Sequence, residues 1–270
     1  MNYSEQTLKE RLAEKKIGSV VRYFQEIDST NIMAYRLALE GAPEGVIVVA
    51  DTQTKGRGRL SRAWYSPSGT NIYVSMILRP RIEPAMASQI TLMAGVAVAS
   101  LFSGYCPEGV SIKWPNDVLI RGKKACGILT EMKASAAGVD FIILGIGLNI
   151  NMNREDFDLS LRDTATSLRM ETGSMHDRLD VISKLFDFID KWYKVFLRAG
   201  FVGLRDTWMS HADILGKRIK VIFKDEIQTG MVTGIDNDGT ILIEGENGVI
   251  QRVIAGDVHL LGEENHAAGH

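Results

Sequence analysis

Apolar runs that fit buried strands recur through the first 150 residues. They occupy 45–50 (GVIVVA), 70–78 (TNIYVSMIL) and 141–150 (FIILGIGLNI). Short runs rich in β-branched and aromatic residues are typical of strands. The pattern predicts a central sheet built from segments that lie far apart in the sequence.

Helical spacing appears between and after these runs. A helix is predicted over 29–41, because Ser29 or Thr30 can accept from its first backbone N–H groups and Gly41 can end it. A second helix ends at Gly200 and carries apolar residues at helical intervals: Leu179, Ile182, Leu185, Phe186, Ile189, Trp192, Tyr193 and Phe196. Interleaved strands and helices imply an α/β layered domain with a mixed sheet.

The longest apolar stretch, roughly 90–102, is shorter than the ~20 residues that a membrane-spanning helix needs. It predicts a buried helix. The N-terminus carries interspersed charges and has no apolar segment typical of a signal peptide. These features predict a cytoplasmic protein that does not bind a membrane.

After about residue 213 the pattern changes to short β-prone runs separated by turns. The runs are 218–223, 230–235, 240–244 and 249–254. Asp238-Gly239 between two of them is a strong hairpin signal. We therefore predict an α/β domain over 1–212, a small SH3-like β-barrel over 213–262, and a disordered tail over 263–270.

Composition and charge limit the function classes. The 270 residues are 45% apolar and 24% charged, with 31 Lys and Arg against 33 Asp and Glu, for a formal net charge of −2. This balance argues against a protein whose whole surface binds nucleic acid, so any anion site must be a local cluster. Cys106 and Cys126 have no metal-ligand spacing, and we predict neither a disulfide nor a protein-ligated metal.

The segment 51–64 (DTQTKGRGRLSRAW) is the most unusual part of the chain. Its four basic side chains stand against one acidic residue, Asp51, and two glycines lie among them. A guanidinium group can donate two parallel hydrogen bonds to the oxygens of one phosphate, and glycine lets the backbone approach an anion closely. The segment is a candidate anion clamp, although a solvated basic loop accounts equally well for the charge alone.

Two further motifs place polar residues beside apolar runs. KWPND at 113–117 indicates a bend at a strand end that turns Asn116 and Asp117 toward a site, or simply a hairpin turn. GIGLN at 145–149 places glycines inside a strand, which indicates close approach by a ligand or another backbone. Neither glycine run completes GxGxxG, and no P-loop, GxSxG or HExxH occurs, so a dinucleotide fold, hydrolase triads and zinc peptidases lack support.

Together these motifs resemble one family, the biotin protein ligases (biotin–[acetyl-CoA-carboxylase] ligases). The resemblance spans about residues 20–262, and the pairing of GRGR with KWPND makes it specific. The family's order and approximate spacing are kept by Asp28-Ser29-Thr30-Asn31, Gln53, Gly56-Arg57-Gly58-Arg59, Arg62, Trp64, Lys113-Trp114-Pro115-Asn116-Asp117, Lys124, Gly127 and Gly145-Ile146-Gly147-Leu148-Asn149.

The resemblance implies a mixed α/β fold related to class II aminoacyl-tRNA synthetases, with catalysis and biotin and ATP binding in residues 1–212. It also implies a two-step reaction that uses ATP and Mg²⁺. Biotin is activated to biotinyl-5′-AMP and then transferred to a lysine of the biotin carboxyl carrier protein of a biotin-dependent carboxylase. A homodimer is expected, and no DNA partner, because the DSTN element begins at residue 28 and leaves no room for the family's N-terminal DNA-binding domain.

The resemblance also implies residue roles. Arg59, Lys113 and Lys124 would be catalytic. Biotin and its adenylate would contact Ser29, Thr30, Asn31, Gln53, Gly56, Arg57, Gly58, Arg59, Lys124 and Gly127. ATP would contact Arg62, Trp64, Asn116, Asp117 and Asn149, with Asn116 or Asp117 organising Mg²⁺ through water.

Two alternatives remain at the level of sequence. A lipoate–protein ligase shares the fold and adenylation chemistry, although not the pairing of GRGR with KWPND. A single-stranded nucleic-acid-binding module would use the basic loop and the small barrel. Residues 216–262 carry five basic and seven acidic residues, which argues against the barrel as a basic platform.

Overall fold

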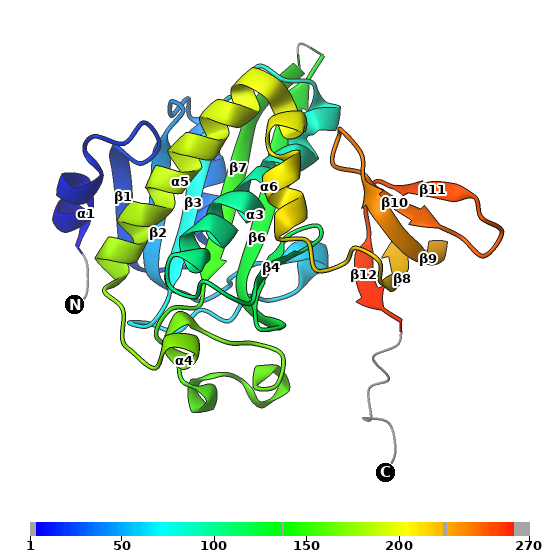
Figure 1. Cartoon of the computed structure of the whole chain (residues 1–270). Coiled ribbons are helices and arrows are strands. Elements are labelled where there is room, and N and C mark those ends of the chain that lie inside the picture. Colours follow the sequence, from blue (N-terminus) through cyan, green and yellow to red (C-terminus); the bar gives the residue numbers. More distant parts are fainter. Residues whose placement is uncertain (1–3, 137, 224–225, 262–270) are drawn as a thin grey trace.

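The computed structural model describes residues 4–136, 138–223 and 226–261. A seven-stranded mixed sheet is followed by a five-stranded antiparallel sheet (Figure 1). The large sheet has the order β1-β2-β3-β7-β6-β5-β4, with β1 Val20–Ile27, β2 Val46–Gln53, β3 Ile72–Leu78, β4 Val110–Lys113, β5 Asp117–Ile120, β6 Lys123–Ser135 and β7 Gly138–Leu148. β1 and β2 are parallel and the other neighbours are antiparallel, so the predicted mixed α/β class is confirmed.

Helices cover both faces of the large sheet. α2 (Thr30–Leu39) packs on β2, β3 and β7, while α3 (Ala87–Ser103) and α5 (Arg178–Ala199) pack together on the opposite face (Figure 1). The remaining helices are short: α1 Glu5–Leu12, α4 Leu168–Thr172 and α6 Arg205–Ser210. The larger core therefore lies between the sheet and the α3–α5 pair.

The predicted helices form within a few residues of their expected limits. α5 ends at Gly200, which has a φ of 62° that favours glycine. α2 ends before Gly41, which has a φ of 91°. Ser29 is at the N-cap of α2, but its side chain makes no capping bond, and Gln53 Oε1 accepts from the Thr30 N–H at 2.9 Å instead. A residue distant in sequence thus caps this helix.

The apolar stretch expected to form a buried helix lies in α3. Among the described residues, Pro84–Ser103 is long and apolar enough to cross a membrane by length and composition alone. Its apolar window is 72% buried inside the fold, against the sheet and α5. The prediction of a buried core helix is confirmed.

The second sheet forms a small all-β unit after α6. Its order is β11-β10-β9-β8-β12, with β8 Arg218–Phe223, β9 Glu226–Ile235, β10 Ile241–Glu244, β11 Ile250–Val253 and β12 Asp257–Leu260. The hairpin predicted at Asp238-Gly239 joins β9 to β10, and Gly239 has a φ of 85°. β12 had no predicted counterpart. The tail predicted at 263–270 lies outside the described residues, and the boundary at 212/213 stays a prediction.

The small unit packs directly on the α/β domain. Trp114 Nε1–H donates to the Gly239 carbonyl at 3.3 Å, and Arg205 Nε–H donates to the Ile235 carbonyl at 3.0 Å. A Cβ on Gly239 would lie 2.3 Å from the end of the Leu92 side chain of α3, and the φ of 85° at this position also favours glycine. These contacts bring β12 to the edge of the large sheet.

Candidate functional site

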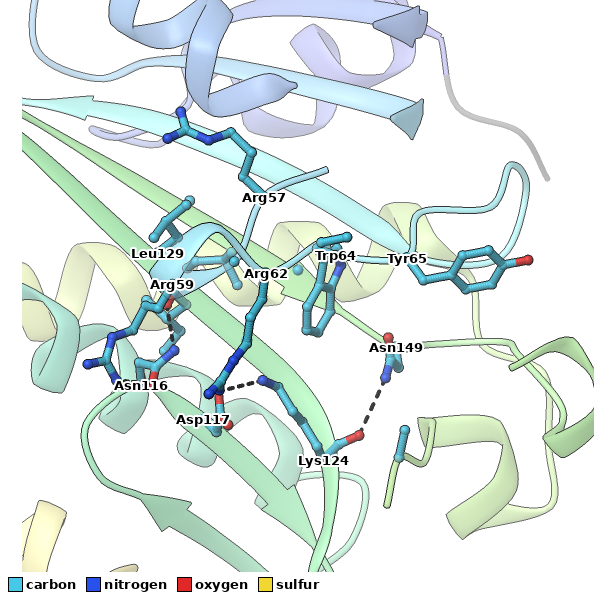
Figure 2. A pocket seen from close by; sticks show the side chains of 18 of the residues that line it. Arg57, Arg59, Arg62, Trp64, Tyr65, Asn116, Asp117, Lys124, Leu129 and Asn149 are labelled. Carbon is cyan, nitrogen blue, oxygen red and sulfur yellow. Dashed lines mark hydrogen bonds and ion pairs between the residues drawn. The ribbon is translucent and has the colours of Figure 1, made fainter. Parts of the chain in front are cut away.

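A cavity of about 310 Å³ opens between the large sheet and the small β unit. Its walls come from the start of α2, the segment after β2, the β4–β5 turn, β6 and β7 (Figure 2). β12 of the small unit also contributes to the lining. All the site residues predicted from the sequence line it except Gly56: Ser29, Thr30, Asn31, Gln53, Arg57, Gly58, Arg59, Arg62, Trp64, Lys113, Asn116, Asp117, Lys124, Gly127 and Asn149. Four motifs from different parts of the chain therefore meet at one cavity.

Gly56 closes the base of the arginine loop, which we define as residues 56–64. The Trp64 N–H donates to the Gly56 carbonyl at 2.9 Å, and the Gly58 N–H donates to the Arg62 carbonyl at 2.7 Å. A Cβ on Gly56 would lie 2.3 Å from the Trp64 carbonyl oxygen, so the loop can close only on glycine. The Gly58 amide is engaged inside the loop, by the Arg62 carbonyl. Guanidinium groups, rather than this amide, face the cavity.

Each arginine of the loop is held by an acceptor from another element. Arg57 pairs with Glu131 of β6 at 3.1 Å. Arg59 donates to Asn116 Oδ1 at 3.0 Å and to the Gly256 carbonyl at 3.3 Å. Arg62 pairs with Asp257 at 2.5 Å. The loop is thus tied to the β4–β5 turn and to β12 of the small unit.

Lys124 of β6 lines the cavity. Its Nζ is 2.7 Å from Asp117 Oδ1 and 5.3 Å from the centroid of the Trp64 ring (Figure 2). The backbone of Asp117 lies opposite that of Lys113 in the antiparallel β4–β5 hairpin. KWPND is therefore both a hairpin turn and a cavity wall, so its two sequence interpretations hold together.

Polar side chains line the end of the cavity at the start of α2. Gln53 Oε1 accepts from the Thr30 hydroxyl at 3.1 Å, and the Ser75 hydroxyl lies 2.7 Å from the Thr30 hydroxyl and 2.5 Å from Asn31 Oδ1. Thr30, Asn31 and Ser75 are buried. Buried groups that hydrogen-bond one another hold fixed orientations, so this end presents polar atoms in set positions.

The glycines inside β6 and β7 make room for side chains. A Cβ on Gly145 would lie 2.0 Å from Asn31 Oδ1, and one on Gly127 or Gly147 would lie 2.6 or 2.5 Å from the Trp64 ring. The close approach expected at GIGLN is therefore made by the side chains of Asn31 and Trp64, not by another backbone. These glycines decide where both side chains lie against the sheet.

Gly147→Ala should displace the Trp64 ring, because the new methyl group would overlap it. We expect a stability loss of about 1–3 kcal/mol in urea unfolding, the usual cost of overpacking, together with stronger acrylamide quenching of tryptophan fluorescence. Gly234→Ala in β9 has no atom within 4 Å of the new Cβ and serves as the matched control. Quenching that rises equally in a Trp64→Phe background would contradict this assignment.

The Asn149 side chain mainly connects backbone segments of the cavity wall. Its Nδ2 donates to the Thr166 carbonyl at 3.0 Å and to the Lys124 carbonyl at 3.4 Å. Its backbone N–H donates to the Ala125 carbonyl. The side chain therefore joins β6, β7 and the segment that follows them at the cavity wall.

Several lining residues were not predicted from the sequence. β12 contributes Asp257, Val258 and His259, and the segment after β7 contributes Met152, Phe157, Leu161 and Ala165. The one sequence signal for the second group is apolar residues within an otherwise polar stretch. The β12 residues carry no local signal, because only the packing of the small unit brings them here.

Positive charge dominates the lining. Five Lys and Arg side chains stand against two Asp side chains, Asp117 and Asp257, although the whole chain is slightly acidic. No group of three or more His, Cys, Asp or Glu that could hold a metal ion occurs among the residues that the structure describes. The cavity is built to receive anions through fixed cations.

Two parts of the chain match known families. Residues 23–149 match the biotin/lipoate A/B protein ligase family, and residues 214–261 match the biotin protein ligase C terminal domain. The bifunctional ligase/repressor BirA of Bacillus subtilis is 38% identical over 257 residues, which cover 95% of this chain and 79% of that relative. The biotin–[acetyl-CoA-carboxylase] ligase of Paracoccus denitrificans is 32% identical, over 82% of this chain and 92% of the relative.

A solved structure shares the fold. The biotin protein ligase from Aquifex aeolicus in complex with biotin and ATP superposes with a TM-score of 0.77 at 32% identity, covering 90% of this chain and 98% of that one. The arrangement of the large sheet and the small β unit is therefore common to both proteins.

Proposed function

Because this chain belongs to the biotin protein ligase family, we propose that it activates biotin with ATP and transfers it to a lysine of a biotin carboxyl carrier protein. The observation that carries this proposal is the convergence of DSTN, GRGR, KWPND and GIGLN on one cationic cavity. In the first step the biotin carboxylate attacks the α-phosphorus, and the bond to the β-phosphate breaks to release pyrophosphate. In the second step the carrier amine attacks the biotinyl carbonyl, loses a proton and releases AMP.

The cations of the cavity oppose the main barrier to the first step. Two unit negative charges 4 Å apart repel by about 4 kcal/mol at an effective dielectric constant of about 20. Lys124 would bridge the biotin carboxylate and the α-phosphate, with Asp117 holding its Nζ in place. Arg59 and Lys113 would add positive charge at the phosphates. This chemistry needs no histidine base and no covalent nucleophile.

The two ends of the cavity would bind the two substrates. Ser29, Thr30, Asn31 and Gln53 form a polar end suited to the ureido group of biotin. Trp64, Arg62 and Asn149, with the apolar Phe157, would contact the nucleotide. Arg57 and Gly58 of the arginine loop, and Gly127 beneath Trp64, would close over the adenylate.

Mg²⁺ would enter with the ATP phosphates, whose charge it neutralises. The residues fit this arrangement, because Mg²⁺ is commonly held by one or two carboxylates with substrate phosphates, and Asp117 is a carboxylate on the cavity wall next to Asn116. We expect Asn116 or Asp117 to organise the ion through water.

Transfer of labelled biotin to a carrier domain, with ATP and Mg²⁺, tests the function directly. If the protein were a lipoate–protein ligase, lipoate would take the place of biotin as the activated substrate. ATP–pyrophosphate exchange that depends on lipoate and not on biotin would therefore overturn the proposal. Salt-dependent binding of single-stranded nucleic acid without biotin affinity would favour the binding-module alternative.

Arg59→Ala should weaken biotin binding about tenfold to a hundredfold and let the adenylate escape. The guanidinium group joins the loop to Asn116 and to the small unit, so its loss opens the cavity to water. Rapid gel filtration of enzyme with labelled biotin and ATP measures the adenylate retained. Arg36→Ala, at an exposed position of α2, is the control, and retention equal to wild type in Arg59→Ala would refute this role.

We also propose a cytoplasmic homodimer as the working form. The family resemblance supports the dimer, and light scattering with and without biotin and ATP measures it. A mass that stays at one chain under both conditions would exclude a stable dimer.

A further inference from the structure

Glu131 contacts two residues of the cavity from outside it. It lies on β6, two positions after the cavity residue Leu129, and side chains two apart on a strand share a face. Its Oε2 accepts from Asn31 Nδ2 at 2.8 Å, and its Oε1 is 3.1 Å from an Arg57 guanidinium nitrogen. Each carboxylate oxygen therefore engages a different lining residue.

The carboxylate is the nearer of two acceptors that set which way the Asn31 amide faces, the other being the Leu129 carbonyl at 3.4 Å from Asn31 Nδ2. An ionised carboxylate only accepts hydrogen bonds, so the amide must turn its NH₂ group toward Glu131. The Asn31 oxygen then faces Ser75, whose hydroxyl donates to it at 2.5 Å. The reversed amide would place its oxygen against the carboxylate. Because Asn31 is buried and lies against Gly145, it has little room to compensate.

The same carboxylate holds one side of the arginine loop. Arg57 is about half exposed, so this ion pair alone is a weak contact that salt screens. The ion pair serves to position the loop, because the loop's other arginines contact Asn116 and β12 at the opposite side. Glu131 thus links the polar end of the cavity at α2 to the arginine loop.

We propose that Glu131 is a positioning residue for biotin, which fixes the Asn31 amide and the Arg57 side chain without touching the ligand. The inference rests on the proposed function. Glu131→Gln keeps the shape but presents both a carbonyl and an NH₂ group. Only the longer contact with the Leu129 carbonyl then favours this Asn31 orientation, and the ion pair with Arg57 is lost. Biotin should bind about tenfold more weakly, while the KM for ATP should change less than about twofold.

Calorimetric titration of the full chain with biotin, at 50 mM and 500 mM NaCl, tests the proposal. The proteins are wild type, Glu131→Gln, Asn31→Ala and the double variant, with Glu26→Gln at an exposed position of β1 as the matched control. At 500 mM NaCl the Arg57 pair is screened, and Glu131→Gln should then have less than a twofold effect in the Asn31→Ala background. At 50 mM NaCl an extra loss from Arg57 should appear.

The outcomes separate the two proposals. Wild type that binds no biotin would refute the proposed function. Wild type that binds biotin while Glu131→Gln binds it equally well, or loses the same factor with and without Asn31, would overturn only the positioning role. If thermal unfolding shows that Glu131→Gln does not fold, Glu131→Asp, which withdraws the carboxylate by one methylene, should show the same rise in biotin Kd with ATP KM unchanged.

Discussion

Replacement of Lys124 by alanine should reduce biotin-dependent ATP–pyrophosphate exchange about 10²–10³-fold. The ammonium group is placed by Asp117 at 2.7 Å within the cavity, where it would oppose the charge that builds on the phosphoryl oxygens. Removal of one preorganised donor of this kind commonly costs a factor of that size. The protein should still fold, because Lys124 is partly exposed and its backbone pairing within the sheet persists.

Lys123→Ala is the matched control for this prediction. Lys123 is adjacent on β6 and is absent from the cavity lining, since neighbouring side chains of a strand point to opposite faces. Exchange should remain within about twofold of wild type in the control. Near-normal ATP–pyrophosphate exchange in Lys124→Ala would contradict a role for this residue in the first step.

Loss of the buried Asp51–Arg178 ion pair should destabilise the fold by about 3–5 kcal/mol. Arg178 of α5 donates to Asp51 at 2.8 Å, and the two side chains are 2% and 0% exposed. Asp51→Ala would remove the carboxylate that neutralises the buried guanidinium charge, while the guanidinium's hydrogen bond to the Asn71 carbonyl remains, and loss of one member of a buried ion pair is the costly case. Asp51 also accepts from Ser68 and from the Gly69 N–H, so the pair fixes both the start and the end of the segment that carries the arginine loop.

Urea unfolding at neutral pH measures this loss. Asp163→Asn, which breaks an exposed pair with Arg154, should cost less than about 1 kcal/mol. The double variant Asp51→Leu/Arg178→Met should recover part of the stability, because it leaves no buried charge alone. A change in Asp51→Ala no larger than that of the exposed control would contradict the assignment.

The Asp51 carboxyl group should also make the free energy of unfolding fall in acid. Burial raises the pKa of Asp51, but hydrogen bonds from Ser68 and Arg178 outweigh burial and hold it below its ordinary value. A lowered pKa in the folded state contributes stability above the unfolded value of about 3.9, and that contribution is lost as the pH falls through the folded pKa. Asp51→Asn should flatten the acid limb of a plot of unfolding free energy against pH, and an unchanged limb would exclude this origin.

Local patterns predicted part of the large domain. β2, β3, β7, α2, α3 and α5 were indicated by runs and spacing within their own residues, whereas β1 and β6 were not predicted. β12 was not, because a four-residue strand carries too little pattern and forms by pairing with β8. The Ser29 cap was expected from residue type, yet Gln53, from a strand far along the chain, supplies the acceptor.

The sequence alone indicated which segments meet at the cavity, since GRGR, KWPND and GIGLN combine guanidinium, amide and glycine groups at spacings that few functions require. The contacts that each of these residues makes were visible only in the folded chain. Gly56 closes a loop, Asn149 joins strands, and Asp257 and Glu131, which no motif marks, hold the arginines. The physical reason is that charge and conformational freedom are properties of single residues, whereas a partner at hydrogen-bond distance depends on how distant segments pack.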